Sequence, residues 1–224
     1  MTAGARAPAE QASQASEWWL RTALVLTAPR AVFVALRDDA PETAAERSEQ
    51  VLLVVWLAGM ASVLSTATAG HLMDDRDYDA LIVAVWTFIA GGLYGVVAYF
   101  VFGAFLHGGV RALGSVGSYR RTRQLLAFAA VPLALSLVLW PVKIALYGSD
   151  VFHRGGADSG AGSTVFEVLG LAFLLWTVAL LVIGVRAVHG WTWGRAAGAV
   201  ALAAVLPLLA VVALSVLSSG WPVE

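Results

Sequence analysis

The chain has 224 residues, of which 59% are hydrophobic and only 13% charged, and its formal net charge is −1. A soluble domain carries about 25% charged residues, so this deficit excludes an ordinary soluble surface and predicts a membrane protein. The near-neutral charge excludes a general attraction to nucleic acid, and the lack of cysteine excludes disulfides, thiolate metal sites and cysteine nucleophiles.

The first fifty residues precede any long apolar run. Residues 1–16 are rich in Ala, Ser, Gln and Pro and are predicted to form a disordered tail. Residues 17–50 form a cytoplasmic or interfacial amphipathic segment, in which apolar side chains at helical spacing predict a short helix over Pro29–Arg37. Arg30 and Arg37 share its opposite side. Two placements fit this helix: on the cytoplasmic leaflet with its arginines toward anionic headgroups, or packed against the underside of a helix bundle.

Five apolar runs follow, each long enough to cross a hydrocarbon core of about 30 Å as a helix. They are Val51–Gly70, Leu81–Leu106, Leu125–Tyr147, Val165–Val185 and Ala196–Leu217. The runs are continuous and too long for barrel strands, so the predicted fold class is all-α, a polytopic transmembrane bundle of five spans over residues 51–217. A preceding helix is expected to begin near Pro41, and residues 218–224 are expected to form a short external tail.

Basic residues predict the direction of the five spans, because Arg and Lys collect in cytoplasmic loops. Five arginines precede the first run, four lie between the second and third runs, and two lie between the fourth and fifth. The other two connections carry one arginine each, and the tail carries none. This alternation predicts a multi-pass protein of the cell (cytoplasmic) membrane with its N-terminus in and its C-terminus out.

Two sequence features predict how the spans pack. Gly91 and Gly95 stand four residues apart in the second run, a spacing that allows another helix to approach closely. Pro132 and Pro141 in the third run and Pro207 in the fifth each remove one backbone hydrogen bond and can kink the helix, and such kinks are more often fixed features of packing than gates.

Lys143 and Glu167 are the ionisable residues most plainly inside the runs, and both are expected near the outer face. Intramembrane charges usually pair or face a cavity, which predicts an interhelical Lys143–Glu167 ion pair clamping the third and fourth spans. The alternative is that Lys143 extends outward to water and Glu167 simply lies in the interface.

No catalytic, cofactor-binding or metal-binding residue is predicted. Asp75, Asp77 and Asp79 have the spacing that begins a calcium loop, but Ala80 stands where glycine is needed and Trp86 where a bidentate glutamate is needed. The four histidines lack the spacing of a zinc site, and the sequence has neither a Walker loop nor a dinucleotide fingerprint. The chain is therefore predicted not to be an enzyme and to need no cofactor.

The most distinctive segment, His107–Arg123, is glycine-rich, basic and predicted to be cytoplasmic. Its candidate contacts to lipid or to a partner are Arg111, Arg120, Arg121 and Arg123. Two interpretations stay open: a site for an anion or a phosphoinositide-like headgroup, or a flexible anchor that obeys the positive-inside rule.

This region also carries a family resemblance. Residues 105–118 (FLHGGVRALGSVGS), followed by 123–132 (RQLLAFAAVP), resemble the bacterial Yip-domain family of five-span integral membrane proteins. Residues 28–33 (APRAVF) are similar to the family's entry segment, and 184–190 (GVRAVHG) to its final loop. The resemblance covers roughly 27–217 and implies five spans, a cytoplasmic N-terminus and no established catalytic residues. Eukaryotic relatives bind Rab-type GTPases through an extended N-terminal region, which is reduced in this chain.

These observations predict a non-enzymatic scaffold or membrane-organising protein that works through lipid or protein contacts at its cytoplasmic face. The expected partners are the lipid bilayer and an unidentified membrane or cytoplasmic protein, with a homo-oligomer left open and nucleic acid excluded. The alternative is a small transporter or channel subunit. That function needs a polar path across the membrane, and the middle of each run is nearly all apolar.

Overall fold

The described part of the chain is helical throughout. In the computed structural model, the described residues are 22–38, 40, 44–45, 47–75, 77–156 and 160–219. They form helices joined by turns, and no strand occurs among them, which confirms the predicted all-α class. The predicted tail 1–16 and Pro41 lie outside the described residues, as does most of 218–224.

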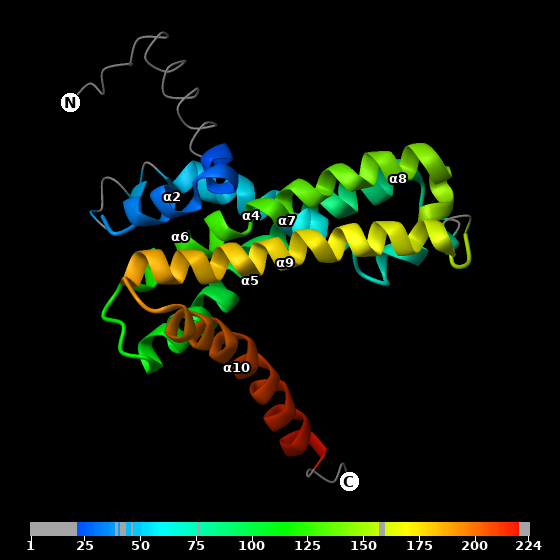
Figure 1. Ribbon diagram of the computed structural model, residues 1–224. Helices are drawn as coiled ribbons and strands as arrows, with labels where there is room; N and C mark the ends of the chain where they lie inside the picture. The colour runs from blue at the N-terminus through cyan, green and yellow to red at the C-terminus, as the bar shows by residue number, and fades with distance from the viewer. Residues whose placement is uncertain are drawn as a thin grey trace, which may run out of the picture.

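Helices follow the predicted apolar runs in chain order (Figure 1). They are α4 (Ser48–Leu64), α5 (Ala80–Ala112), the series α6 to α8, α9 (Ala161–His189) and α10 (Trp193–Ser219). Among the described residues, three stretches are long and apolar enough to cross a membrane, and they are Ala80–Ala112, Tyr119–Phe152 and Gly162–His189. α4 (Ser48–Leu64) and the part of α10 over Trp193–Pro207 are shorter apolar stretches.

Large apolar side chains on α5 and α9 face outward. Leu93 is 60% exposed and Val97 58% on α5, and Leu171 and Leu175 are more than half exposed on α9. Soluble proteins rarely expose contiguous apolar surface on this scale. These faces are suited to contact with the hydrocarbon of a lipid bilayer.

The first apolar helix is shorter than the predicted run, because α4 ends at Leu64 instead of Gly70. The hydroxyls of Ser65 and Thr66 donate to carbonyls three or four residues earlier, at 2.8 and 2.6 Å. Such side-chain bonds compete with continued helix. A short 3₁₀ segment, η1 (Ala69–Asp74), then leads toward α5.

The third apolar run is divided into segments. These are α6 (Tyr119–Ala129), α7 (Val131–Leu135), η2 (Ser136–Val138), α8 (Leu139–Tyr147) and η3 (Gly148–Phe152). Pro132 and Pro141 each lie in the first turn of a segment, where a missing N–H costs no helical hydrogen bond. The two prolines thus mark breaks in the run, while a kink at Pro207, which lies within α10, stays a prediction.

Glycines allow α4 and α5 to pack backbone against backbone. A Cβ added to Gly59 would lie 2.7 Å from Gly95 Cα, and one added to Gly91 would lie 2.6 Å from Met60 Cα. Real side chains essentially never approach so closely. The close helix approach predicted at Gly91 and Gly95 is confirmed, and the approaching helix is α4.

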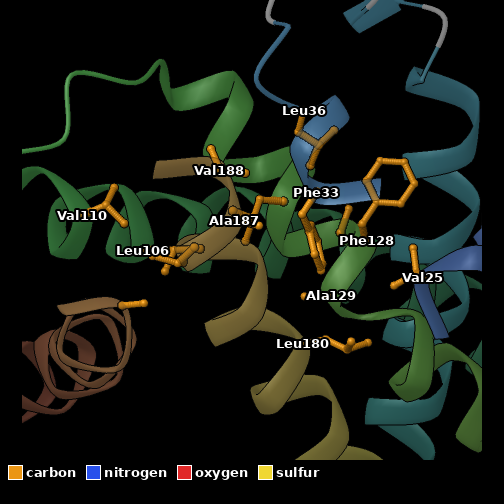
Figure 2. Packing of buried hydrophobic residues seen from close by; sticks show 14 of the residues in the cluster. Val25, Phe33, Leu36, Leu106, Val110, Phe128, Ala129, Leu180, Ala187 and Val188 are labelled. Atoms are coloured by element: carbon orange, nitrogen blue, oxygen red, sulfur yellow. The ribbon is translucent and has the colours of Figure 1, made fainter. Parts of the chain in front are cut away.

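The short helix α2 (Pro29–Ala35) packs against α9. Phe33 is fully buried and Leu36 is 2% exposed. Figure 2 shows Phe33 among side chains of the main core, with Phe128 of α6 and Ala187 of α9 nearby. Of the two placements predicted for this helix, the structure shows packing on the bundle.

The bundle has two distinct ends. Figure 1 shows α2, the α5–α6 turn and the α9–α10 turn gathered at one end, which we call the basic end because most of the described arginines lie there. The connection from α8 to α9 lies at the opposite end, together with η1 and η3, which pack against each other. From the basic end α10 crosses α5 near Gly109 and then runs away from the other helices.

Candidate functional site

The α5–α6 turn at the basic end positions the predicted contact arginines. Gly114 has φ +86°, a left-handed conformation that favours glycine. The Ser118 hydroxyl then caps α6 by accepting a hydrogen bond from the Arg121 N–H at 3.1 Å. Arg111 is exposed in the last turn of α5, and Arg120 is half-buried in the first turn of α6.

Arg123 directs its guanidinium into an aromatic cluster of the fold. Its Cζ lies 5.1, 4.3 and 4.7 Å from the ring centroids of Tyr99, Phe100 and Tyr119. Gly103 leaves room for the side chain, since a Cβ there would lie 2.5 Å from Arg123 Cγ. The Tyr119 hydroxyl donates to the Phe100 carbonyl at 2.7 Å. Cation–π contacts of this kind stabilise the packing of α6 on α5.

Arg121 takes part in a chain of contacts that joins α6, α2 and α9. Its Nη2 donates to the Arg37 carbonyl at 3.0 Å. Arg37 in turn donates from Nε and Nη2 to the Ala187 carbonyl, at 3.0 and 2.6 Å. The four predicted contact arginines therefore have different environments: Arg121 and Arg123 contact the fold, whereas Arg111 lies exposed at the end of α5.

A second group of arginines converges where α2 meets α9, on a pocket of about 340 Å³ that we call the arginine pocket. Its lining residues are Arg30, Val34, Arg37, Ile183, Arg186, Ala187, Gly190, Trp191 and Trp193. Three of them are arginines and none is acidic. The sequence did not predict that these arginines meet at one pocket. The only sign of it was that Arg186, Trp191 and Trp193 lie close together along the chain and that the 29–37 helix carries two arginines.

Two tryptophans stack on arginines beside the pocket. Arg186 Cζ lies 4.4 Å from the Trp193 ring centroid, and Arg195 Cζ lies 4.3 Å from that of Trp191. The geometry depends on Gly190, which ends α9 with φ +68° and turns the chain toward the tryptophans. Arg195 Nε also donates to the Leu113 carbonyl at 3.1 Å, which ties α10 to the α5–α6 turn.

The side chains of the arginine pocket are chemically suited to an anion. A guanidinium stacked on an aromatic face still offers in-plane N–H donors that match two oxygens of a phosphate or carboxylate. Arg186 Nε is buried and has no hydrogen-bond partner within the described part of the chain. Indole rings favour the depth of lipid headgroups, and Trp191 and Trp193 in the pocket lining are residues of this type.

The aspartate loop before α5 has structural contacts. Asp79 caps α5 by accepting from the Ile82 N–H at 2.8 Å. Asp75 accepts from the Asp77 N–H at 3.1 Å, which closes a local turn. No group of three His, Asp or Glu residues that could hold a metal ion occurs among the residues that the structure describes.

Lys143 and Glu167 line one cavity of about 710 Å³ at the opposite end of the bundle. The Lys143 Nζ lies 5.2 Å from the ring centroid of Trp140. Glu167 lies on an exposed part of α9. The structure thus brings the two predicted residues to the same cavity, and their direct ion pair stays a prediction.

Long apolar helices with lipid-suited faces, ending in a cluster of arginine and aromatic side chains, define a helical membrane protein. The Yip1 domain matches residues 23–215, which is most of the chain, and the chain belongs to the Yip1-domain family. No curated protein and no solved structure gave a significant match.

Proposed function

We propose that this chain is a non-enzymatic, multi-pass protein of the cell membrane that organises lipid or protein contacts at its basic end. The arginine pocket carries the proposal, because its described lining residues supply three guanidinium groups and no acidic side chain. Anionic lipids give the cytoplasmic leaflet a negative surface potential. A lipid phosphate is therefore the ligand that the charge and the depth of the pocket favour.

The proposal includes five spans with the basic end in the cytoplasm. At a rise of 1.5 Å per residue, the 17 residues of α4 extend about 25 Å and the 27 residues of α10 about 40 Å. Both helices are therefore of a length that can cross a bilayer, and together with the three longer stretches they make five spans. The orientation is supported by the arginines of α2 and of the two turns at the basic end, since basic residues favour the cytoplasmic side.

The contacts of Arg37 prepare the pocket for a ligand. This residue holds α2 against α9 through the Ala187 carbonyl, so the arginines of the two helices are brought together before any ligand binds. Preorganisation lowers the cost of ordering long side chains on binding. Arg30 and Arg186 then supply guanidinium donors from the two walls.

Native mass spectrometry of the full chain with added lipids tests the proposal. The wild type should retain anionic phosphatidylglycerol more strongly than neutral phosphatidylcholine. Arg30→Gln and Arg186→Gln should each raise the apparent Kd for the anionic lipid about tenfold, because each removes a charge-assisted hydrogen bond. Arg154→Gln, which removes an exposed arginine at the opposite end of the bundle, is the matched control.

Two results would overturn the proposal. One is anionic-lipid binding by the two pocket variants that equals that of Arg154→Gln. The other is a flux of small solutes or ions through proteoliposomes above that of empty vesicles, which would favour the transporter or channel alternative.

A further inference from the structure

The cavity at the opposite end lies between helices that are far from the arginine pocket. Its walls come from α4, α7, η2, α8, η3 and α9. Along α9 it extends from Ser163 to Leu174, which corresponds to about 16 Å at the helical rise per residue. The cavity volume of about 710 Å³ is in the range of sites for small organic ligands.

The cavity changes from polar to apolar along its length. Near the α8–α9 connection it is lined by Ser163 and Glu167 of α9 and by Lys143 of α8. One to two turns further along α9 the lining residues are Leu171 and Leu174. A ligand that matches this gradient has an ionic head at the connection and a hydrocarbon chain toward the middle of the helices.

Hydroxyl groups in the α4 wall offer acceptors. Ser62 and the two residues that follow α4, Ser65 and Thr66, donate their protons to carbonyls of α4, at 2.8, 2.8 and 2.6 Å. A hydroxyl whose proton is used in this way has only lone pairs left for another partner. Together with the Glu167 carboxylate, these oxygens favour a head that donates hydrogen bonds and carries positive charge.

The cavity also presents positive charge. Arg154 is engaged by Asp74: its Nε lies 3.7 Å from Oδ2, and its backbone N–H donates to Oδ1 at 3.0 Å. Lys143 brings an ammonium to the wall, over the face of Trp140. An ammonium on one wall and a carboxylate on another match a ligand that carries both a phosphate and an amine.

The cavity lies where two helices part. α9 packs against α7 and η2, whereas α8 packs mainly against η2 and η3. Both α8 and α9 contribute to the cavity wall, which therefore lies beside the lipid-suited face of α9. A membrane lipid can approach such a site from the bilayer without crossing the bundle.

We propose that this cavity binds a zwitterionic phospholipid with a primary ammonium headgroup. Glu167 and the α4 hydroxyls receive the ammonium, Lys143 receives the phosphate, and Leu171 and Leu174 contact an acyl chain. This inference is independent of the proposed function, because it involves other residues and a zwitterionic lipid instead of an anionic one. A primary ammonium donates three hydrogen bonds and a choline group none, so ethanolamine and choline lipids of equal net charge are distinguished.

Native mass spectrometry of the full chain with phosphatidylethanolamine, phosphatidylcholine and phosphatidylglycerol tests this site. The wild type should bind the ethanolamine lipid about tenfold more tightly than the choline lipid, the discrimination expected of one charge-assisted hydrogen bond. Glu167→Gln should remove that preference. Glu49→Gln, which removes an exposed carboxylate in the first turn of α4 at the basic end, should leave it unchanged.

A second variant fills the cavity while it keeps both charges. Gly170 lines the cavity, and a Cβ added there meets no atom within 4 Å, so Gly170→Leu should fold and exclude the lipid. Ala179→Leu introduces the same side chain on an exposed face of α9 and is the control. Retention of the ethanolamine preference in Gly170→Leu, or equal binding of the ethanolamine and choline lipids by the wild type, would overturn the inference. Arg186→Gln should leave ethanolamine binding intact, so failure at either end of the molecule is recognised separately.

Discussion

Replacing Gly59 by alanine tests the close packing of α4 on α5. A Cβ at this position would lie 2.7 Å from both the Cα and the N of Gly95, with the Gly91 carbonyl oxygen closer still. Ordinary contact begins at about 3.4 Å, so the helices would have to separate locally by about 0.7 Å or more. Overpacking of this kind costs about 1–3 kcal/mol, and the better helix propensity of alanine returns up to about 1 kcal/mol. We expect a net loss of about 1–2 kcal/mol in the free energy of unfolding.

Unfolding by SDS in mixed micelles, followed by tryptophan fluorescence, measures this loss. Gly170→Ala is the matched control, because it is the same substitution within a helix and its Cβ meets no atom within 4 Å. The control should be neutral or slightly stabilising. Equal unfolding free energies for Gly59→Ala and Gly170→Ala would refute the backbone-to-backbone contact of α4 and α5.

The remaining predictions concern arginines and the direction of the chain. Arg123→Gln should lower the unfolding free energy by about 1–2 kcal/mol, because three aromatic rings lose their cation. Arg111→Gln, the control at an exposed position, should change it by less than about 0.5 kcal/mol. Similar effects of the two substitutions would contradict the cation–π cluster. Arg37→Gln should cost about 1–2 kcal/mol in the same assay by releasing α2 from α9, and a neutral result would show that its two hydrogen bonds do not hold the helices together. The chain has no cysteine, so an impermeant maleimide reports the position of a single introduced thiol. Arg154→Cys should be labelled in intact cells. Val116→Cys, at a position that is 94% exposed, should be labelled only after the membrane is permeabilised. Labelling of Val116→Cys in intact cells would contradict the proposed orientation.

The apolar helices could be predicted from sequence because solvation by lipid is a local requirement. Each apolar side chain in a run favours the hydrocarbon whatever its tertiary neighbours are, so hydropathy alone finds the run. Their ends could not be predicted in the same way. Ser65 and Thr66 bond their hydroxyls to α4 carbonyls near its end, and the third run is divided near Pro132 and Pro141, because backbone hydrogen bonding is not recorded in hydropathy.

The glycine spacing predicted a close approach, but it could not identify the approaching helix. Any helix with a small residue at the right level can contact Gly91 and Gly95. In the structure Gly59 supplies that residue, and α4 and α5 are the helices that meet. The sequence thus contained the requirement for a small partner, while the choice of partner depends on how all helices pack together.

The candidate sites show why the number of arginines in each loop indicates which end of the bundle is basic but not which arginines form a site. Counting arginines treats every guanidinium as equal, yet Arg123 is surrounded by aromatic rings and Arg121 donates to a backbone carbonyl. Arg30 and Arg186 become neighbours only because α2 packs on α9, through an Arg37 contact to a residue 150 positions away. Groups that satisfy their donors within the fold stabilise it, and the proposed ligand contacts are guanidinium groups gathered around a pocket whose described lining has no acidic side chain. The arginines that we propose to bind a ligand are therefore brought together by tertiary contacts among helices, which neither the loop charges nor the hydropathy of the runs contain.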